Sequence, residues 1–372
     1  MERKGLAARL NAGIGRIVRE SLAITARNPR ERMFLARFAF RAWLDGRSRL
    51  ASAAQGRHVP PFLIASITDR CNLQCAGCYA RARADFGKNG GPDPLSASEW
   101  GRIFREAHEL GVSFVLLAGG EPLVRDDVLD EAAKLTSLVF PVFTNGTLLQ
   151  GRYLDFFDRH RHLIPILSLE GNEAVTDTRR GMGVHASVGS AMAAMRKRNI
   201  FFGASVTVTR DNLAEVTDDA FIGDLCVRGC RIVFYVEYVP VDGVSLKALP
   251  SADRGWLAER IAELRARKDP ILFVSFPGDE DALGGCLAAG RGFFHISARG
   301  FAEACPFSPY SDVNLGNVPL SAALDSPLFA ALRERGFLES THDGGCALFA
   351  HDAETRDLEE RLREGTYKNE NA

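Results

Sequence analysis

The first sixty positions show a helical repeat of apolar residues. Every fourth position from 6 to 22 is apolar, at Leu6, Leu10, Ile14, Val18 and Leu22, and arginines occupy other sides of the helical wheel. This spacing predicts an amphipathic basic helix. Asn28-Pro29 ends it, and the largely apolar segment 33–44 predicts a second helix that another part of the protein must cover. We expect residues 1–60 to form a helical extension.

From residue 61 onward, short apolar runs alternate with amphipathic segments. The runs expected to form strands cover 62–68, 114–118, 139–144, 164–169, 202–208, 232–239 and 271–276. The segments expected to form helices lie near 96–110, 126–136, 151–160, 187–198, 213–226 and 252–268. Ser96 and Glu99 mark one helix start as a capping box. Strands and helices that alternate at this interval predict a parallel α/β sheet.

Polar residues recur at alternate positions near the ends of several predicted strands. Side chains two residues apart in a strand share one face of the sheet. These polar sets are Ser66 and Thr68, Ser168 and Glu170, Ser205, Thr207 and Thr209, and Tyr235 and Glu237. Because strands of a flat, doubly wound sheet are apolar on both faces, one polar face favours a curled sheet around a polar cavity. We expect Tyr235 and Glu237 to project inward as candidate catalytic residues, for substrate contact or proton transfer.

Charge is distributed unevenly along the 372 residues. Residues 1–60 carry thirteen Lys and Arg against four Asp and Glu, a net charge of +9, whereas the whole chain has a net charge of −1. The basic helices are expected to pack on the outside of the main domain. The alternative is an arm, residues 1–50, that binds the inner membrane surface or a partner. Without a transmembrane run or a signal-peptide pattern, we expect a cytoplasmic protein with no nucleic-acid partner.

Eight cysteines in a protein expected in the cytoplasm indicate metal binding or catalysis rather than disulfides. Cys71, Cys75 and Cys78 lie within eight residues, directly after the first predicted strand. Three thiolates can hold a cubane iron–sulfur cluster and leave one iron open to a ligand that is not protein. Zinc is the main alternative, although a structural zinc site wants four ligands and usually shows paired CxxC spacings. Cys226 and Cys230 are expected to serve packing.

The CxxxCxxC spacing on a loop after a strand resembles the radical S-adenosylmethionine (SAM) superfamily. The resemblance covers roughly residues 60–350 and implies a partial (β/α)6, TIM-like barrel. It also implies a [4Fe–4S] cluster on the three cysteines and SAM bound to the open iron. The residues that it places around SAM are Tyr79, Gly119, Gly120, Glu121, Asn145, Ser168, Glu170 and Arg180.

Two parts of this pocket carry specific roles in the superfamily. The Gly119-Gly120-Glu121 run resembles the motif that contacts the amino group of SAM, and Arg180 resembles the arginine that can pair with its carboxylate. The family usually has Asp where Glu170 stands, so the geometry of the ribose and methionine contacts is expected to differ there.

The last hundred residues carry three further cysteines around a predicted β-hairpin. The hairpin is expected over 293–305, with its turn at 298–300. This arrangement resembles the SPASM and twitch extensions of radical SAM enzymes, which hold auxiliary [4Fe–4S] clusters. The resemblance implies one such cluster here, held by Cys286, Cys305 and Cys346. Its fourth ligand stays open among substrate, water and a side chain such as His351 or Asp312.

These expectations combine into one functional hypothesis. The basic helical extension precedes a radical SAM partial barrel over 61–270 and an auxiliary-cluster extension over 271–372. The resemblance implies an enzyme that cleaves SAM to a 5′-deoxyadenosyl radical, with electrons from a flavodoxin or ferredoxin, and that abstracts hydrogen from a substrate. A peptide or protein substrate is favoured, and a lipid, isoprenoid or small metabolite is the alternative. A zinc or electron-transfer protein without enzymatic activity is the alternative of another class.

Overall fold

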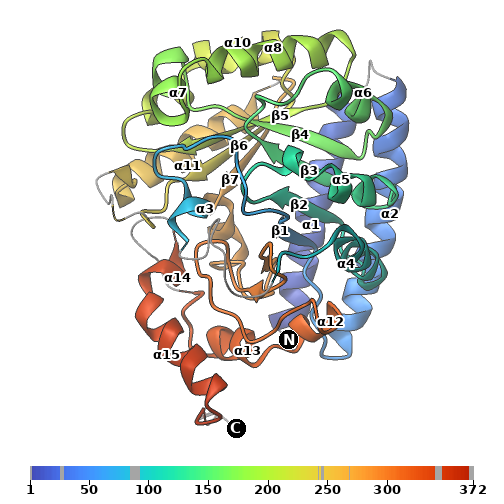
Figure 1. Ribbon diagram of the computed structural model, residues 1–372, viewed down its shortest axis with the longest axis vertical. Helices are drawn as coiled ribbons and strands as arrows, with labels where there is room; N and C mark the ends of the chain where they lie inside the picture. Colours follow the sequence, from blue (N-terminus) through green and yellow to red (C-terminus); the bar gives the residue numbers. More distant parts are fainter. Residues whose placement is uncertain are drawn as a thin grey trace.

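The protein is organised around one curled, nine-stranded sheet (Figure 1). A computed structural model describes residues 2–25, 29–83, 93–241, 243, 247–267, 269–339 and 346–367. The strand order is β7-β6-β5-β4-β3-β2-β1-β8-β9, parallel from β7 to β8 and antiparallel between β8 and β9. The strands are β1 (Phe62–Ser66), β2 (Phe114–Ala118), β3 (Phe140–Thr144), β4 (Leu163–Ser168), β5 (Gly203–Val208), β6 (Ile232–Glu237), β7 (Leu272–Phe276), β8 (His295–Ile296) and β9 (Ala302–Glu303). The α/β class and the parallel half-barrel predicted from the sequence are confirmed.

Helices between the strands cover the convex face of this sheet. They are α4 (Ala97–Leu110), α5 (Asp126–Ala133), α6 (Arg152–Arg159), α7 (Glu173–Arg180), α8 (Val184–Lys197), α9 (Leu213–Val216), α10 (Asp219–Arg228) and α11 (Ser251–Ala266). The capping box of Ser96 and Glu99 is present at the start of α4. On this helix Trp100 and Phe104 are fully buried, and the Phe104 ring meets Phe140 edge-on at 5.2 Å between centroids.

One predicted helix is divided in two, and another was not predicted. The segment 213–226 forms α9 and α10, because Asp218 ends the first turn and its carboxylate accepts from the backbone N–H of Phe221 at 2.6 Å. The polar helix α7 lacks the apolar periodicity by which a helix is recognised in a sequence. It nevertheless carries Arg180, one of the residues expected at the SAM site.

The basic extension forms two long helices, α1 (Glu2–Ile24) and α2 (Pro29–Ala54), which pack together across the N-terminal ends of the barrel strands (Figure 1). Their apolar side chains share a core with residues at the starts of β3 to β7: Ile14, Val18, Phe38 and Ala42 with Val139, Ile164, Ile166, Phe201, Ile232 and Leu272. Packing of these helices on the main domain is thereby confirmed.

Buried polar contacts fix the two helices at this end of the barrel. Glu31 is 1 % exposed, pairs with Arg161 at 2.5 Å and accepts from the backbone N–H of Phe201. Arg49 donates to the carbonyl of Gly111 and, at 2.9 Å, to the hydroxyl of Ser113. Breaking a buried ion pair leaves an uncompensated charge, so these contacts anchor the extension strongly.

The outward face of α2 carries large apolar side chains among exposed arginines. Met33, Phe40 and Trp43 are 56, 65 and 54 % exposed, and the guanidinium of Arg47 lies 5.0 Å from the centre of the Trp43 ring. Membrane or partner contact through this face stays a prediction. No helix among the described residues combines the length and the apolar character needed to cross a bilayer.

The C-terminal part continues the sheet. The predicted hairpin is present as β8 and β9, and β8 pairs in parallel with β1. Around it lie η3 (Gly278–Leu283), α12 (Ser321–Leu324), α13 (Pro327–Glu334), α14 (Ala347–Ala350) and α15 (Asp352–Arg363). In Figure 1 these helices form the lower part of the molecule, near the start of α1. The hairpin is thus an extension of the barrel sheet at its β1 edge.

Candidate active site

The two glycines at the end of β2 allow the chain that enters the cysteine loop to pass directly against this strand. A Cβ on Gly119 would lie 2.3 Å from the carbonyl oxygen of Thr68, and one on Gly120 would lie 2.0 Å from that of Arg70. The backbone N–H groups of Gly120 and Glu121 donate to these same carbonyls at 2.8 Å. A side chain at either glycine would push the cysteine loop away from the strand edge.

Glu121 is buried at this edge and joins β2 to β3. Its carboxylate accepts from the hydroxyl of Thr144 at 2.7 Å and from the backbone N–H groups of Leu123 and Asn145 at 3.0 and 2.8 Å. Burial raises the pKa of Glu121 despite these donors. Asn145 in turn donates to the side-chain oxygen of Asn72 at 2.9 Å, which ties the end of β3 to the cysteine loop.

Cys71, Cys75 and Cys78 are partly exposed on that loop and influence one another electrostatically. Burial raises the pKa of Cys71, and the neighbouring Glu121, Cys75 and Cys78 add to the shift. The backbone N–H of Ala76 donates to the carbonyl of Arg179 at 2.8 Å, so the loop is held against α7. Three thiols that face a strand edge form a donor set suited to an iron–sulfur cluster with an open iron.

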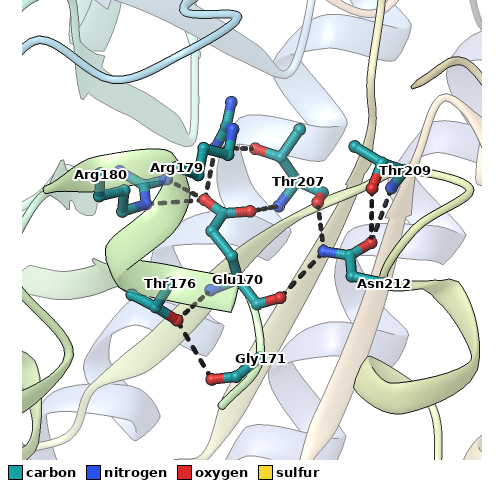
Figure 2. A network of polar contacts seen from close by, with 8 residues as sticks. All are labelled: Glu170, Gly171, Thr176, Arg179, Arg180, Thr207, Thr209 and Asn212. Atoms are coloured by element: carbon teal, nitrogen blue, oxygen red, sulfur yellow. Dashed lines mark hydrogen bonds and ion pairs between the residues drawn. The ribbon is translucent and has the colours of Figure 1, made fainter. Parts of the chain in front are cut away.

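Glu170 lies at the centre of a polar network beside this loop (Figure 2). It is fully buried, and its carboxylate accepts from Arg179, from Arg180 and, at 3.2 Å, from the backbone N–H of Thr207. Arg179 also donates to the hydroxyl of Thr207 at 3.1 Å. Asn212 donates to the backbone carbonyls of Glu170 and Thr207 and thereby holds the ends of β4 and β5 together.

Arg180 is the charged group that this network presents to the cysteines. Burial opposes its charge, but Glu170 and the thiols of Cys75 and Cys78 outweigh burial and raise the pKa of Arg180. The structure therefore brings the expected Arg180 and Glu170 to the cysteine loop. Ser168 is placed opposite Ser205 in the β4–β5 register, on the polar face that the alternation predicted.

The prediction that Tyr235 and Glu237 project inward is wrong. They do not share a face of the sheet with the serines and threonines of β5. In the β5–β6 register Ser205 lies opposite Phe234, so Tyr235 belongs to the other face. The Tyr235 ring is fully buried and its hydroxyl donates to the carbonyl of Val216, at the end of α9, at 2.7 Å. Tyr235 is therefore a packing residue on the helix-covered face, and we assign it no catalytic role.

Glu237 ends β6 on the same face as Tyr235 and lines a cavity outside the barrel. It is 5 % exposed, and burial raises its pKa to about 7. Its Oε2 has no hydrogen-bond partner among the described residues. The cavity has a volume of about 1170 Å³, and Cys71, Cys75 and Cys78 do not line it. Its wall includes Arg9, Glu237, Arg254, Glu280, Cys286 and Arg291.

A second set of buried polar residues joins Ser66 and Tyr79, which the sequence analysis named, to His295, Glu303 and Arg83, which it did not. Ser66 and His295 are hydrogen-bonded at 2.7 Å, His295 contacts Glu303 at 2.7 Å, and Arg83 holds Glu303 with two bonds of 2.6 and 2.7 Å. Burial of the phenol raises the pKa of Tyr79 to about 12, and Tyr79 also hydrogen-bonds Ser66. This chain connects the cysteine loop to the hairpin. The sequence signal for His295 and Glu303 is weak, because each lies in a strand of only two residues.

The three C-terminal cysteines are buried and lie close enough to affect one another. Burial raises the pKa of Cys286 and of Cys305 well above the ordinary value, while a hydrogen bond with Cys305 lowers the pKa of Cys346. Within the described ranges, no three or more His, Cys, Asp or Glu side chains are grouped as a single metal ion requires. A cluster at either triad is therefore inferred from the thiols themselves and from their mutual electrostatic influence.

The two side chains considered as a fourth ligand are engaged elsewhere. Asp312 accepts from the hydroxyl of Ser326 at 2.6 Å and from the backbone N–H of Leu328 at 2.8 Å, so it helps to cap α13. The ring of His351 stacks on Phe337, and its Nδ1 lies 3.3 Å from Glu354.

Comparison with known proteins places this site in a family. Residues 65–221 match the model of the Radical SAM superfamily. Pre-heme d1 synthase of Dinoroseobacter shibae is 30 % identical over 335 residues, which cover 79 % of this chain and 80 % of the relative. AdoMet-dependent heme synthase of Methanosarcina barkeri is 27 % identical over 306 residues, which cover 74 % of this chain and 85 % of the relative.

Solved structures show the same fold at low sequence identity. Streptococcus suis SuiB bound to the precursor peptide SuiA has a TM-score of 0.63 at 18 % identity, covering 79 % of this chain and 72 % of SuiB. The AdoMet-bound anSMEcpe has a TM-score of 0.56 at 14 % identity, and the match covers 82 % of this chain and 98 % of anSMEcpe. This chain belongs to the radical SAM superfamily, and it is an enzyme that uses a [4Fe–4S] cluster and SAM.

Proposed function

We propose that Cys71, Cys75 and Cys78 hold the catalytic cluster and that SAM lies between them, the β2 edge and Arg180. When bound, these cofactors supply a 5′-deoxyadenosyl radical that abstracts a hydrogen atom from the substrate. The observation that carries this proposal is the convergence of the thiols with Glu121 and Arg180 at the C-terminal ends of the strands, where α/β folds bind ligands.

The surrounding residues have distinct parts in this proposal. Arg180 pairs with the SAM carboxylate, and Glu170 acts on SAM through Arg180, because its own carboxylate is held by protein donors. The strand edge at Gly119, Gly120 and Glu121 receives the amino group. The remaining contacts are assigned to Asn145, Ser168 and Tyr79.

A second, auxiliary [4Fe–4S] cluster is proposed on Cys286, Cys305 and Cys346. The supporting observations are the burial of all three thiols and the hydrogen bond between Cys305 and Cys346. Electrons are supplied by a flavodoxin or ferredoxin, in accordance with the resemblance from which the function was inferred.

A peptide or protein is the first substrate candidate. It is supported by the fold shared with SuiB, which was solved with its precursor peptide. A small carboxylated molecule of the tetrapyrrole class is the second candidate. It is supported by the names of two relatives that match most of this chain, a pre-heme d1 synthase and an AdoMet-dependent heme synthase.

Anaerobic reconstitution tests the proposal as a whole. We expect a brown protein with about eight irons per chain, from two four-iron clusters, that forms 5′-deoxyadenosine from SAM under dithionite. Cys75→Ala should abolish 5′-deoxyadenosine formation and remove about four irons, whereas Cys226→Ala should change neither. A protein that binds zinc and does not cleave SAM would contradict the proposal.

The substrate candidates are separated by the same assay in deuterated form. A precursor peptide encoded beside the gene, or a carboxylated porphyrinoid, is added with its abstractable hydrogens replaced by deuterium. Deuterium in 5′-deoxyadenosine identifies the substrate class, and its absence with a candidate removes that candidate.

A further inference from the structure

Glu280 is a buried carboxyl group beside the proposed auxiliary cluster. It lies on η3, six residues before Cys286, and only 4 % of it is exposed. Its carboxyl group accepts from the backbone N–H of Leu287, lies within hydrogen-bonding reach of the thiol of Cys286, and is close enough to Cys346 for their charges to interact. Glu280 and Cys286 line the same cavity wall. Glu280 is thus in contact with one proposed cluster ligand and near a second.

One oxygen of this carboxyl group is left without a hydrogen bond. Glu280 Oε1 is buried and has no partner among the described residues. The nearby guanidinium of Arg291 donates instead to the carbonyls of Cys286 and Gly284, both at 2.9 Å, and to that of Leu338 at 3.2 Å. A buried polar atom without a partner is costly, and a metal ligand role is one of the few that would satisfy it.

The thiol set itself is one ligand short. A [4Fe–4S] cubane offers four iron positions, and three cysteines fill three of them. Asp312 and His351 are occupied by a helix cap and by a ring stack, as described above. Carboxylate oxygen is a harder ligand than thiolate, but it is within the range of donors that iron accepts.

We propose that the carboxylate of Glu280 is the fourth ligand of the auxiliary cluster held by Cys286, Cys305 and Cys346. This inference rests on the proposed auxiliary cluster. Ligation forms one iron–oxygen bond, sends the carboxyl proton to solvent and changes no oxidation state. The auxiliary cluster then has no open iron, so its part is electron transfer and the substrate does not bind to it.

The test uses the full-length chain with Cys71, Cys75 and Cys78 replaced by Ala, so that only the auxiliary cluster is loaded. With Glu280 intact we expect about four irons per chain. The reduced cluster should show no ¹³C hyperfine coupling when ¹³C-cyanide is added, because every iron is ligated by protein. In Glu280→Ala the coupling should appear. Asp281→Asn, an exposed neighbour on the same turn, should behave like the intact chain.

Each result decides between the two proposals. Absence of iron in the Glu280-intact chain overturns the auxiliary cluster itself. Four irons together with cyanide binding in the Glu280-intact chain overturns the role of Glu280 and leaves the cluster in place. Glu280→Cys guards against a variant that loses its iron by misfolding. It should keep about four irons and exclude cyanide, and cyanide binding to it would count against the proposed position.

Discussion

At the scale of single residues, Glu170 shows how an unusual side chain is accommodated. The sequence revealed that Glu stands where the family usually has Asp. It did not reveal that Arg179, from a helix without apolar periodicity, would supply a second guanidinium to the same carboxylate.

Gly77, which stands just before Cys78, has a φ of +65°, a conformation that favours glycine and disfavours the side chain of any other residue.

Replacing Glu170 by Gln should destabilise the cofactor-free protein. The change leaves two partly buried guanidinium groups without their common anion, and we expect a loss of about 3 kcal/mol in the free energy of unfolding. Chemical denaturation of the apoprotein measures it. Glu173→Gln, on the exposed surface of the same helix, should cost less than about 1 kcal/mol. Equal effects of the two changes would contradict the assigned role of Glu170.

Glu237 should make the stability of the protein depend on pH. Its pKa is raised from 4.5 to about 7 by burial, so between these values the folded state binds the proton and the unfolded state releases it. The free energy of unfolding therefore falls as pH rises through this window, by about 3 kcal/mol in total. Glu237→Gln should remove this component when denaturation is compared at pH 5 and pH 8. A variant with the slope of the parent protein would show that Glu237 ionises normally.

At the scale of elements, α1 and α2 close the barrel at the N-terminal ends of its strands. Their amphipathic spacing was visible in the sequence, and so was the need for a covering surface. Which surface covers them was not visible, because Phe38 meets Phe114 across 76 positions of the chain.

Two phenylalanines on α2 provide a matched test of how this helix packs on the barrel. Phe38 is 5 % exposed and Phe40 is 65 % exposed. Phe38→Ala should lower the free energy of unfolding by about 3 kcal/mol, because it opens a cavity between the helix and the sheet. Phe40→Ala should change it by less than about 0.5 kcal/mol. Thermal or denaturant unfolding of both variants decides, and a similar loss for each would mean that α2 packs differently.

The Phe40 variant also bears on the remaining prediction of membrane contact. If the exposed face of α2 binds anionic lipid, Phe40→Ala combined with Trp43→Ala should reduce sedimentation with anionic vesicles several-fold, since apolar burial drives interfacial binding. Neutral vesicles serve as the control. Unchanged sedimentation would show that the exposed face of α2 does not bind anionic lipid.

The strands illustrate what sequence can and cannot fix. All seven barrel strands were predicted, because compact apolar runs between turns are a local signal. The facing of β6 was not predicted correctly, because Phe234 and Tyr235 are adjacent aromatic residues and either can point inward. Only pairing with β5 decides between them, and a register shift of one residue exchanges the two faces.

At the scale of the whole molecule, the chain of Ser66, His295, Glu303 and Arg83 connects the barrel to the C-terminal extension. Burial raises the pKa of Glu303, but Arg83 and His295 outweigh burial and hold it below the ordinary value. Stability from this carboxylate is therefore present above its unfolded pKa and is lost as pH falls through the folded pKa. The sequence could not show this, since its members lie in segments more than two hundred residues apart.

Glu303→Gln should loosen the hairpin and destabilise the protein by about 3 kcal/mol, because it removes the buried carboxylate that accepts two bonds from Arg83 and contacts His295. Amide hydrogen exchange of residues 294–304 should increase. Glu354→Gln breaks another contact between Glu and His, but that pair lies at the surface, with the side chains of His351 and Glu354 30 and 52 % exposed. It should cost less than about 1 kcal/mol. If amide hydrogen exchange of residues 294–304 does not change in Glu303→Gln, the network does not hold the hairpin to the barrel.

The parallel pairing of β1 with β8 has a consequence for how the two cysteine triads are joined. β1 leads into the first thiol triad, and the hairpin of β8 and β9 ends just before Cys305 of the second. Neighbouring strands are spaced about 4.8 Å apart by their hydrogen bonds. Because β8 lies between β1 and β9, three hydrogen-bonded strands join the first triad to Cys305, with no flexible linker between them. Clusters bound at the two proposed sites would therefore be held at one separation by the sheet itself.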